Sequence, residues 1–304
     1  MENKISAKLH VYKCCPVCSS TKIAPILAAE DYTVSHEEFE IWECANCSLR
    51  FIQNIPVETE IGKYYQSEEY ISHSNTNKGL INRLYQVVRG ITLQQKKNLV
   101  QRLSGKRSGM ILDIGCGTGE FLGTMKSAGW QTKGLEPDDG ARQQAISNFA
   151  LSVDSPDQLF SLEGGSYDVV SMWHVLEHVH QLKENVAQIR KLLKADGTLI
   201  IAVPNYQSKD AEHYGKQWAA YDVPRHLYHF SPQAMDELMS ANGFAVKDHR
   251  RMPFDAFYVS MLSEQYRHGK LRLVSAFFSG LSSWWHNLFH KKRGSSIIYV
   301  IKPV

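Results

Sequence analysis

The chain has 304 residues, of which 43% are hydrophobic and 21% charged, as in ordinary globular proteins. This length allows one large α/β domain with a small additional module. The formal net charge of +3 is nearly balanced, whereas a dedicated nucleic-acid binder carries a strong basic excess. The sequence shows neither the apolar core of a signal peptide nor an apolar run long enough for a spanning helix. We therefore expect a cytoplasmic protein.

Four of the six cysteines form two C-x-x-C pairs, Cys15 with Cys18 and Cys44 with Cys47. Each pair places two thiolates on one tight turn, and two facing pairs complete a tetrahedral zinc site. The reduced cytosol disfavours disulfides, although buried or redox-active thiols remain an alternative, and Cys14 could replace Cys15. We predict a zinc-binding module over residues 1–56, with zinc in a structural role because four cysteines leave no open position.

Residues 57–106 have the spacing of apolar residues that is typical of helices, and we assign them to a helical linker or lid. From residue 107 the pattern alternates between short apolar strands and amphipathic helices. The expected strands are 110–114, 130–136, 167–173, 198–204, 244–250 and 295–303. The expected helices are 117–129, 137–148, 186–197 and 231–243. Such alternation predicts a doubly wound, mainly parallel α/β sheet in residues 107–304, with a helical insertion at about 254–293.

A glycine-rich loop follows the first strand of the predicted sheet and begins the next helix. It reads Asp113-Ile114-Gly115-Cys116-Gly117-Thr118-Gly119, and glycines let the backbone turn tightly and approach a ligand. Free N–H groups at the helix start suit a carboxylate, whereas Asp113 suits a cationic amino group. Glu136, at the end of the second strand, can accept both hydroxyls of a ribose. The loop therefore favours a nucleoside ligand that carries an amino group and a carboxylate.

Two other interpretations of this loop fit less well. A nicotinamide dinucleotide site uses G-x-G-x-x-G and must accept a pyrophosphate. The spacing here is G-x-G-x-G, and Asp113 would repel a pyrophosphate. A purely structural glycine turn would not account for the preceding strand, the following helix and Glu136 together.

Residues 110–204 resemble the class I S-adenosylmethionine-dependent methyltransferase domain. The resemblance rests on the D-x-G-x-G-x-G loop, GLEPD at 134–138 and YDVVSMWHVLEHV at 167–179. It implies a seven-stranded sheet with an antiparallel last strand, a role that residues 295–303 could fill. It also implies that residues from four loops bind the cofactor: Asp113, Gly115, Cys116, Gly117 and Gly119 at the methionine part, Glu136 and Pro137 at the ribose, Asp154 and Ser155 at the adenine, and Trp173 and His174 along one side.

The cysteine pairs and DVPRHLYHFSP at 222–232 are together similar to a bacterial subgroup of these enzymes that has an N-terminal zinc-binding region. Its members often accompany genes for surface polysaccharide or lipid-linked sugar synthesis. The resemblance implies a small or lipid-linked acceptor, such as a glycan or lipid biosynthetic intermediate.

Several histidines follow the fourth and fifth strands, at the edge where ligands bind in open α/β sheets. Methyl transfer usually requires removal of a proton from the acceptor, and a neutral histidine is a natural general base. His178 is the first candidate, followed by His226 and His229, although such histidines also cap helices or bind backbone carbonyls. Tyr228 is a candidate substrate residue. Arg225 could pair with a substrate phosphate or carboxylate, or form an internal salt bridge.

The stretch at 270–293 is apolar and aromatic with basic ends. We predict peripheral contact with the inner membrane surface through this segment, because Trp and Lys suit headgroups and anionic lipid. A lid, a core helix or a dimer contact is the alternative.

Two further functions stay open besides a methyltransferase of small or lipid-linked acceptors. One is an RNA methyltransferase that grips nucleic acid with the zinc module, which the near-neutral charge disfavours. The other is a non-catalytic cofactor-binding interaction domain, which the presence of both Asp113 and Glu136 disfavours. A dehydrogenase fits least, because of the electrostatic argument above.

Overall fold

The computed structural model describes residues 9–65, 80–252 and 254–304, with side chains from Gly90 onward in the second range. Its centre is a seven-stranded sheet. The strands, in chain order, are β6 (Met110–Ile114), β7 (Gln131–Leu135), β8 (Ser152–Asp154), β9 (Tyr167–Trp173), β10 (Leu193–Pro204), β12 (Phe244–Arg251) and β13 (Ser296–Pro303).

The strands lie in the order β12-β13-β10-β9-β6-β7-β8. From β10 to β8 all neighbours are parallel, whereas β13 runs antiparallel to both β10 and β12. The predicted sheet and its antiparallel last strand are therefore confirmed. β7 and β8 follow on one side of β6, whereas β9 lies on its other side, so the chain changes the direction in which it adds strands between β6 and β9. Ligands bind at such a switch point in open α/β sheets.

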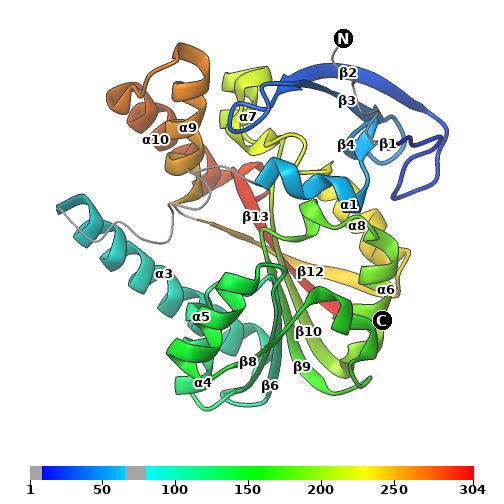
Figure 1. Cartoon of the computed structure of the whole chain (residues 1–304), viewed down its shortest axis with the longest axis vertical. Helices are drawn as coiled ribbons and strands as arrows, with labels where there is room; N and C mark the ends of the chain where they lie inside the picture. Colours follow the sequence, from blue (N-terminus) through cyan, green and yellow to red (C-terminus); the bar gives the residue numbers. More distant parts are fainter. Residues whose placement is uncertain (1–8, 66–79, 253) are drawn as a thin grey trace, which may run out of the picture.

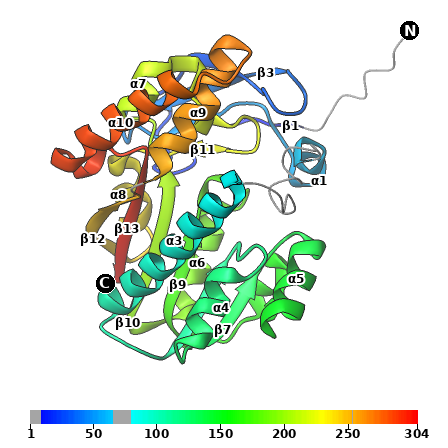
Figure 2. The ribbon, with the colours of Figure 1, turned by 90° about the vertical axis from the view of Figure 1, so that its left-hand side faces the viewer.

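Helices cover both faces of this sheet (Figures 1 and 2). One face holds α3 (Leu80–Ser104), α4 (Glu120–Ser127) and α5 (Asp139–Phe149), and the other holds α6 (Leu182–Leu192) and α8 (Pro232–Ser240). Alternate strand residues divide between the two cores, since Ile111 packs with α3 and α4 while Leu112 packs with α6 and α8. This alternation explains why the strands read as continuous apolar runs.

The helix predicted over 186–197 is wrong at its C-terminal end. Helix α6 ends at Leu192, and β10 begins at Leu193. Leu193 pairs with Tyr167 of β9, after which the register shifts before Thr198. Pairing with the neighbouring strand, a long-range contact, overrides the local helical preference of the sequence.

A four-stranded antiparallel sheet carries the cysteine pairs and lies at the top of Figure 1. Its order is β11 (Tyr228–His229), β4 (Arg50–Ile52), β3 (Glu38–Cys44) and β2 (Ile23–Glu30). The short strands β1 (Leu9–His10) and β5 (Ile55–Pro56) pair beside it, and α1 (Glu58–Ile61) follows. Because β11 belongs to the segment after β10, this sheet joins chain from both sides of Pro56. The domain boundaries at residues 56 and 106 stay predictions.

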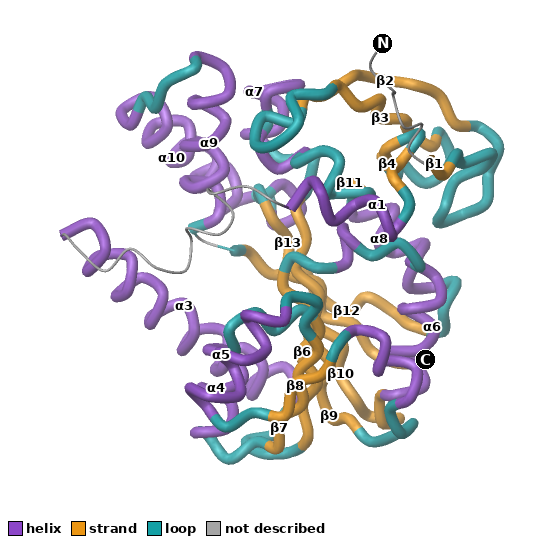
Figure 3. Tube along the Cα trace, viewed as in Figure 1, coloured by secondary structure: helices purple, strands orange, loops and turns teal. Residues whose placement is uncertain are grey.

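The insertion near the C-terminus forms two helices, α9 (Asp255–His268) and α10 (Leu273–Phe289), which pack against each other and against α7 (Lys209–Tyr214). Figure 3 shows α9 and α10 side by side. Small residues face α9: a Cβ at Gly280 would lie 2.9 Å from the Cα of Phe257. No helix within the described ranges is long and apolar enough to cross a membrane.

Candidate functional site

The glycine loop between β6 and α4 forms an open cradle. Gly115, Gly117 and Gly119 all have positive φ, at 73°, 54° and 84°, a conformation that other residues rarely adopt. A Cβ at Gly115 would lie 2.4 Å from Cγ2 of Val175, whereas a Cβ at Gly117 would meet no atom within 4 Å. The outer glycines therefore allow close packing, and the loop leaves open space above Gly117.

Asp113 lies at the carboxyl end of β6 and is 2% exposed. Its Oδ1 accepts a hydrogen bond of 2.6 Å from the Ser171 hydroxyl. Burial raises the pKa of Asp113 to about 7, although Ser171 and the charge of Lys96 act in the opposite direction. A bound amino group would favour the ionised carboxylate, because an opposite charge at close range lowers a carboxyl pKa. The site of Asp113 thus fits a cationic amino group.

Glu136 follows β7 and is held beside the loop by two backbone amides. Its carboxylate accepts the Gly117 N–H at 2.8 Å and the Asp138 N–H at 3.0 Å. Burial raises the pKa of Glu136, while these two amide bonds oppose the shift. Each carboxylate oxygen can accept more than one hydrogen bond, so the orientation that the amides fix leaves capacity for hydroxyl donors.

The other cofactor candidates lie at the same edge of the sheet. Cys116 is buried against Gly134, where a Cβ would lie 2.7 Å from its sulfur. Pro137 follows Glu136 directly. Asp154 ends β8 and forms an ion pair with Lys133, and Ser155 comes next. The positions follow from the parallel strands, whose carboxyl ends meet at one edge.

Trp173 and His174 end β9, between the glycine loop and the histidines that follow. Lys96 of α3 lies over the Trp173 ring, 4.3 Å from its centroid. His174 has a φ of 58°, and its Nδ1 lies 3.5 Å from Oε1 of Glu177. These two residues therefore connect the cofactor edge with a polar cluster deeper in the fold.

That cluster consists of Glu177, His178 and His226. Glu177 is fully buried, and neither carboxylate oxygen has a hydrogen-bond partner among the described residues. Burial alone would raise the pKa of Glu177, but the facing His174 and the charges of nearby histidines lower it overall. A buried, ionised carboxylate is costly unless groups of opposite charge lie close to it. It can stabilise positive charge on the imidazoles around it.

The two histidines are each held through Nδ1 by a backbone carbonyl. Nδ1 of His178 lies 3.0 Å from the Arg225 carbonyl, and Nδ1 of His226 lies 2.9 Å from the Ala220 carbonyl. A carbonyl only accepts, so each Nδ1 carries a proton, and Nε2 of the neutral His178 ring can accept one. Nε2 of His226 lies 4.0 Å from Oε1 of Glu177, and the two rings are 4.6 Å apart. Burial lowers the pKa of His178 to about 4, which keeps this ring neutral at pH 7.

The three remaining candidates, His229, Tyr228 and Arg225, lie in the wall behind this cluster. His229 is 2% exposed and donates from Nε2 to the Tyr221 carbonyl at 2.9 Å. The Tyr228 hydroxyl lies 2.8 Å from that of Tyr12. These contacts are internal to the protein.

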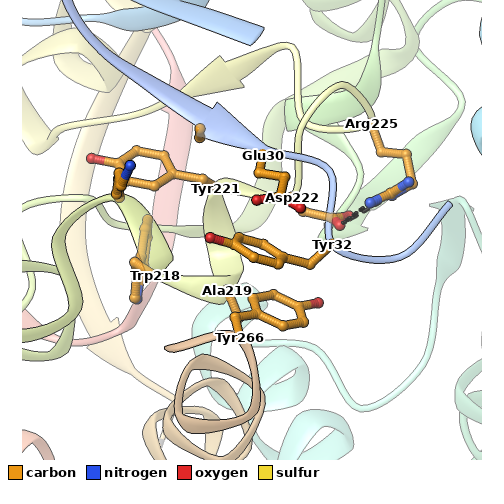
Figure 4. A pocket seen from close by; sticks show the side chains of 10 residues that line it. Glu30, Tyr32, Trp218, Ala219, Tyr221, Asp222, Arg225 and Tyr266 are labelled. Atoms are coloured by element: carbon orange, nitrogen blue, oxygen red, sulfur yellow. Dashed lines mark hydrogen bonds and ion pairs between the residues drawn. The ribbon is translucent and has the colours of Figure 1, made fainter. Parts of the chain in front are cut away.

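Arg225 adopts the internal alternative that the sequence left open. Its guanidinium is 2% exposed and bonds Asp222 at 2.7 Å, Asp31 at 2.9 Å and the Tyr64 carbonyl at 2.8 Å. Figure 4 shows Arg225 among the residues around Asp222, with Tyr32 and Tyr266 beside each other. Arg225 therefore fixes the segment that carries His226 against the cysteine-bearing sheet.

Sequence reasoning missed the residues that support this site. Asp31 lies in the turn after β2, and its carboxylate also accepts Ser35 N–H at 2.8 Å. The hydroxyl of Tyr65 lies 3.0 Å from Nδ1 of His178. Asp222, three residues before Arg225, was the one partner with a local signal. Nothing in the spacing of the other two indicates which residue they meet.

The four predicted metal ligands gather between the turns of the N-terminal sheet. The sulfurs of Cys15 and Cys47 are 3.5 Å apart, as are those of Cys18 and Cys44, and all four lie within 4.8 Å of one another. Four sulfurs at about 2.3 Å from a tetrahedral zinc would be separated by about 3.8 Å. Hydrogen bonding from Cys47 lowers the pKa of Cys15 to about 5. The donor set and its geometry fit a zinc ion.

Comparison with known proteins agrees with this architecture. Ubiquinone biosynthesis O-methyltransferase from Nitrosococcus oceani is 28% identical over 182 residues, which cover 55% of this chain and 73% of that protein. Its counterpart from Burkholderia vietnamiensis is 32% identical over 114 residues, covering 35% of this chain and 48% of that protein.

A similar fold occurs in magnesium protoporphyrin IX methyltransferase from Synechocystis with bound S-adenosylhomocysteine. It has a TM-score of 0.51 and 16% identity, over 79% of this chain and 97% of that one. The profile of the methyltransferase domain family matches residues 90–249, more than half of the chain. The predicted methyltransferase fold is confirmed. The predicted enzyme class, an S-adenosylmethionine-dependent methyltransferase, is confirmed as well. The chain therefore belongs to the methyltransferase domain family.

Proposed function

We propose that this methyltransferase acts on a small or lipid-linked acceptor, at the histidine cluster beside the end of β9. The observation that carries the proposal is the fully buried carboxylate of Glu177, which lies beside His174 and close to the imidazoles of His178 and His226. The similarity to enzymes named as O-methyltransferases supports an oxygen acceptor. The acceptor class remains that of a glycan or lipid biosynthetic intermediate.

The glycine loop and three strand ends would hold S-adenosylmethionine. Asp113 would bind the amino group, the amides beyond Gly117 the carboxylate, and Glu136 the ribose hydroxyls, with Pro137 beside them. Asp154 and Ser155 would contact the adenine, and Trp173 and His174 would line the edge towards the acceptor. When bound, the cofactor supplies an electrophilic methyl group on a sulfonium. The protein contributes mainly position, because transfer needs the acceptor in line with that methyl.

His178 and His226 would receive the acceptor proton. His178 is the more accessible of the two and is neutral at pH 7 because burial lowers its pKa. A ring with so low a pKa is a weak base by itself, so the proton would come to rest where negative charge is near. Glu177 and Asp222 lie 4.0 and 3.8 Å from Nε2 of His226. His229, bonded to Tyr221, would support the wall and take no proton.

A labelling assay tests the proposal. The purified chain is incubated with methyl-labelled S-adenosylmethionine and extract of its native cells, and label is separated between organic and aqueous phases. His178→Gln and Glu177→Gln should lower transfer by roughly 10²-fold or more with cofactor affinity unchanged. His213→Gln, at an exposed histidine, is the control and should keep full transfer. Full activity of both cluster variants would refute the assignment of the base.

The cysteine cluster would hold one structural zinc ion with Cys15, Cys18, Cys44 and Cys47 as ligands. The support is the closeness of the four sulfurs and the burial of three of them. The module is small, so a metal would supply stability that its own core cannot.

The outer face of α10 would rest on an anionic membrane surface in the cytoplasm. The large apolar residues that are exposed on it are Leu273, Val274, Phe277, Phe278, Trp285 and Phe289. Lys291 and Lys292 follow directly, and a basic rim on an apolar face suits anionic lipid. Phe278→Glu should reduce flotation with phosphatidylglycerol vesicles, whereas Phe160→Glu, at an exposed phenylalanine far along the chain, should not. Equal flotation of the two variants would contradict the contact.

A further inference from the structure

A cavity of about 600 Å³ lies between α3, the end of β12 and α10. This volume is in the range of about 300–1,000 Å³ found for small-molecule sites. Its described lining includes five lysines and arginines, namely Lys96, Arg102, Arg250, Arg251 and Lys291, together with His249, and no aspartate or glutamate. So many cations around one hollow repel one another and create a positive potential inside it.

Most of these cations have no negative partner. Arg250 forms an ion pair with Asp248. Arg102, Arg251 and Lys291 form no ion pair with any part of the chain that the structure describes, and Lys96 lies over the Trp173 ring. Burial lowers the pKa of Lys96, although the charges of Asp113 and Asp255 oppose the shift. A bound anion would relieve both the repulsion and this burial cost.

Three buried nitrogens in the described lining also lack partners, and one of them is Nε1 of Trp173. Nε of Arg250 and Nε2 of His249 are buried and form no hydrogen bond among the described residues. Unsatisfied buried polar atoms are uncommon, and each costs on the order of 1–3 kcal/mol. An anionic ligand with several oxygens could accept from Arg250 and His249.

The cavity begins at the cofactor edge and ends beside the exposed face of α10. Trp173 lines its inner part and ends β9, next to the histidine cluster. Trp284 of α10 lines the cavity and also a shallower hollow with Phe278, Trp285 and Phe289. A ligand placed here would reach from the transfer site towards the apolar face.

We propose that this cavity binds a diphosphate group carried by the methyl acceptor. The inference rests on the proposed function, because it names the anionic part of that same acceptor. Arg251 and Lys291 would hold the phosphate oxygens at the mouth, and Lys96 would meet them inside. Diphosphate is carried by lipid-linked and by nucleotide-linked intermediates, and the two sources share this chemistry.

Calorimetric titration with inorganic diphosphate, without added divalent metal, tests the cavity directly. We expect saturable binding that weakens about tenfold or more in the double variant Arg251→Ser with Lys291→Ser, because two charge-assisted contacts are lost. Both side chains are exposed, so the fold should not change. Lys247→Ser is the control: it removes one positive charge from the strand that carries Arg251, outside the cavity, and should leave affinity unchanged.

Three results would overturn the proposal: no saturable binding, equal affinity in the double variant, or equal loss in Lys247→Ser. The affinity for S-adenosylmethionine, measured in parallel, should be the same in all proteins. Its loss in the double variant would place these residues in the cofactor site and would also contradict the proposal. These titrations measure binding and not methyl transfer. A failure of the proposed function would therefore show in the labelling assay and not here.

A second titration separates the two sources of diphosphate. Farnesyl diphosphate and uridine diphosphate are compared under the same conditions. Tighter binding of the prenyl compound would support a lipid-linked acceptor, and tighter binding of the nucleotide would support a nucleotide-linked one. Binding of neither would overturn the assignment of the cavity to a diphosphate-bearing acceptor.

Discussion

Replacing Asp31 by asparagine should destabilise the protein and loosen the segment that carries His226. Asp31 is fully buried, and its Oδ1 lies 2.9 Å from the Arg225 guanidinium. Burial alone would raise the pKa of Asp31, but Arg225 and the amides of the turn lower it to about 2. Compared with the ordinary value of 3.8, this shift corresponds to about 2 kcal/mol of stability at pH 7.

The loss of stability in Asp31→Asn should be smaller than the loss from breaking a buried ion pair completely. Removing one partner of such a pair typically costs about 3–5 kcal/mol. In Asp31→Asn, however, Arg225 keeps Asp222 at 2.7 Å and the Tyr64 carbonyl at 2.8 Å. The asparagine oxygen can still accept from the turn amides. We therefore expect a loss of about 2 kcal/mol.

The loss has a defined pH dependence. The pKa of Asp31 is lower in the folded state, so its contribution is complete above pH 4 or so and disappears as the pH falls towards about 2. The difference between the wild-type protein and Asp31→Asn should therefore shrink on acidification, to about 1 kcal/mol near pH 3. Guanidinium unfolding followed by tryptophan fluorescence at several pH values measures it.

Asp157→Asn is the control, because it removes the same charge from an exposed position. It should change stability by less than about 0.5 kcal/mol at any pH. If Asp31→Asn matched this control at pH 7, the Arg225 pair would contribute nothing to stability. A loss that stayed constant between pH 7 and pH 3 would refute the electrostatic explanation.

Three further predictions concern the cofactor and metal sites. Glu136→Ala should weaken S-adenosylmethionine binding by roughly 1.5–3 kcal/mol in calorimetry, and unchanged affinity would place the ribose elsewhere. Gly115→Ala should abolish that binding and destabilise the fold, because φ is 73° and the new Cβ would lie 2.4 Å from Val175; a wild-type melting temperature would contradict this. Cys44→Ser should lower the zinc content measured by atomic emission and the unfolding temperature, whereas Cys14→Ser should change neither.

The parallel part of the fold could be predicted because its strands are short apolar runs that end at glycines or acids. Met110–Ile114 and Tyr167–Trp173 lie where the sequence placed them. The order of the strands was not predicted, since alternation alone does not say which strand lies beside which. The end of α6 was misplaced because pairing of Leu193 with Tyr167 is a long-range contact.

The candidate site residues could be proposed from local patterns and stay predictions, but the contacts between them could not be foreseen. The glycine loop and the histidines carry local patterns, and the loop follows β6 as expected, whereas His229 lies in β11 of the four-stranded sheet. Arg225 meets Asp31, and nothing near either residue in the sequence indicates the other. The same holds for Lys96, which reads as one charge on an amphipathic helix until the fold places it over Trp173.

The pairing of β11 with β4 affects how the chain folds during its synthesis. Phe51 faces Tyr228 across this pair, so the contact closes a loop of 177 residues, the difference between the two numbers. Contacts of such separation form late, because loop closure must precede any gain from pairing. During synthesis the ribosome must therefore deliver most of the chain before the histidine segment finds its support. A truncated or stalled product would contain the glycine loop and yet lack the organised histidine segment.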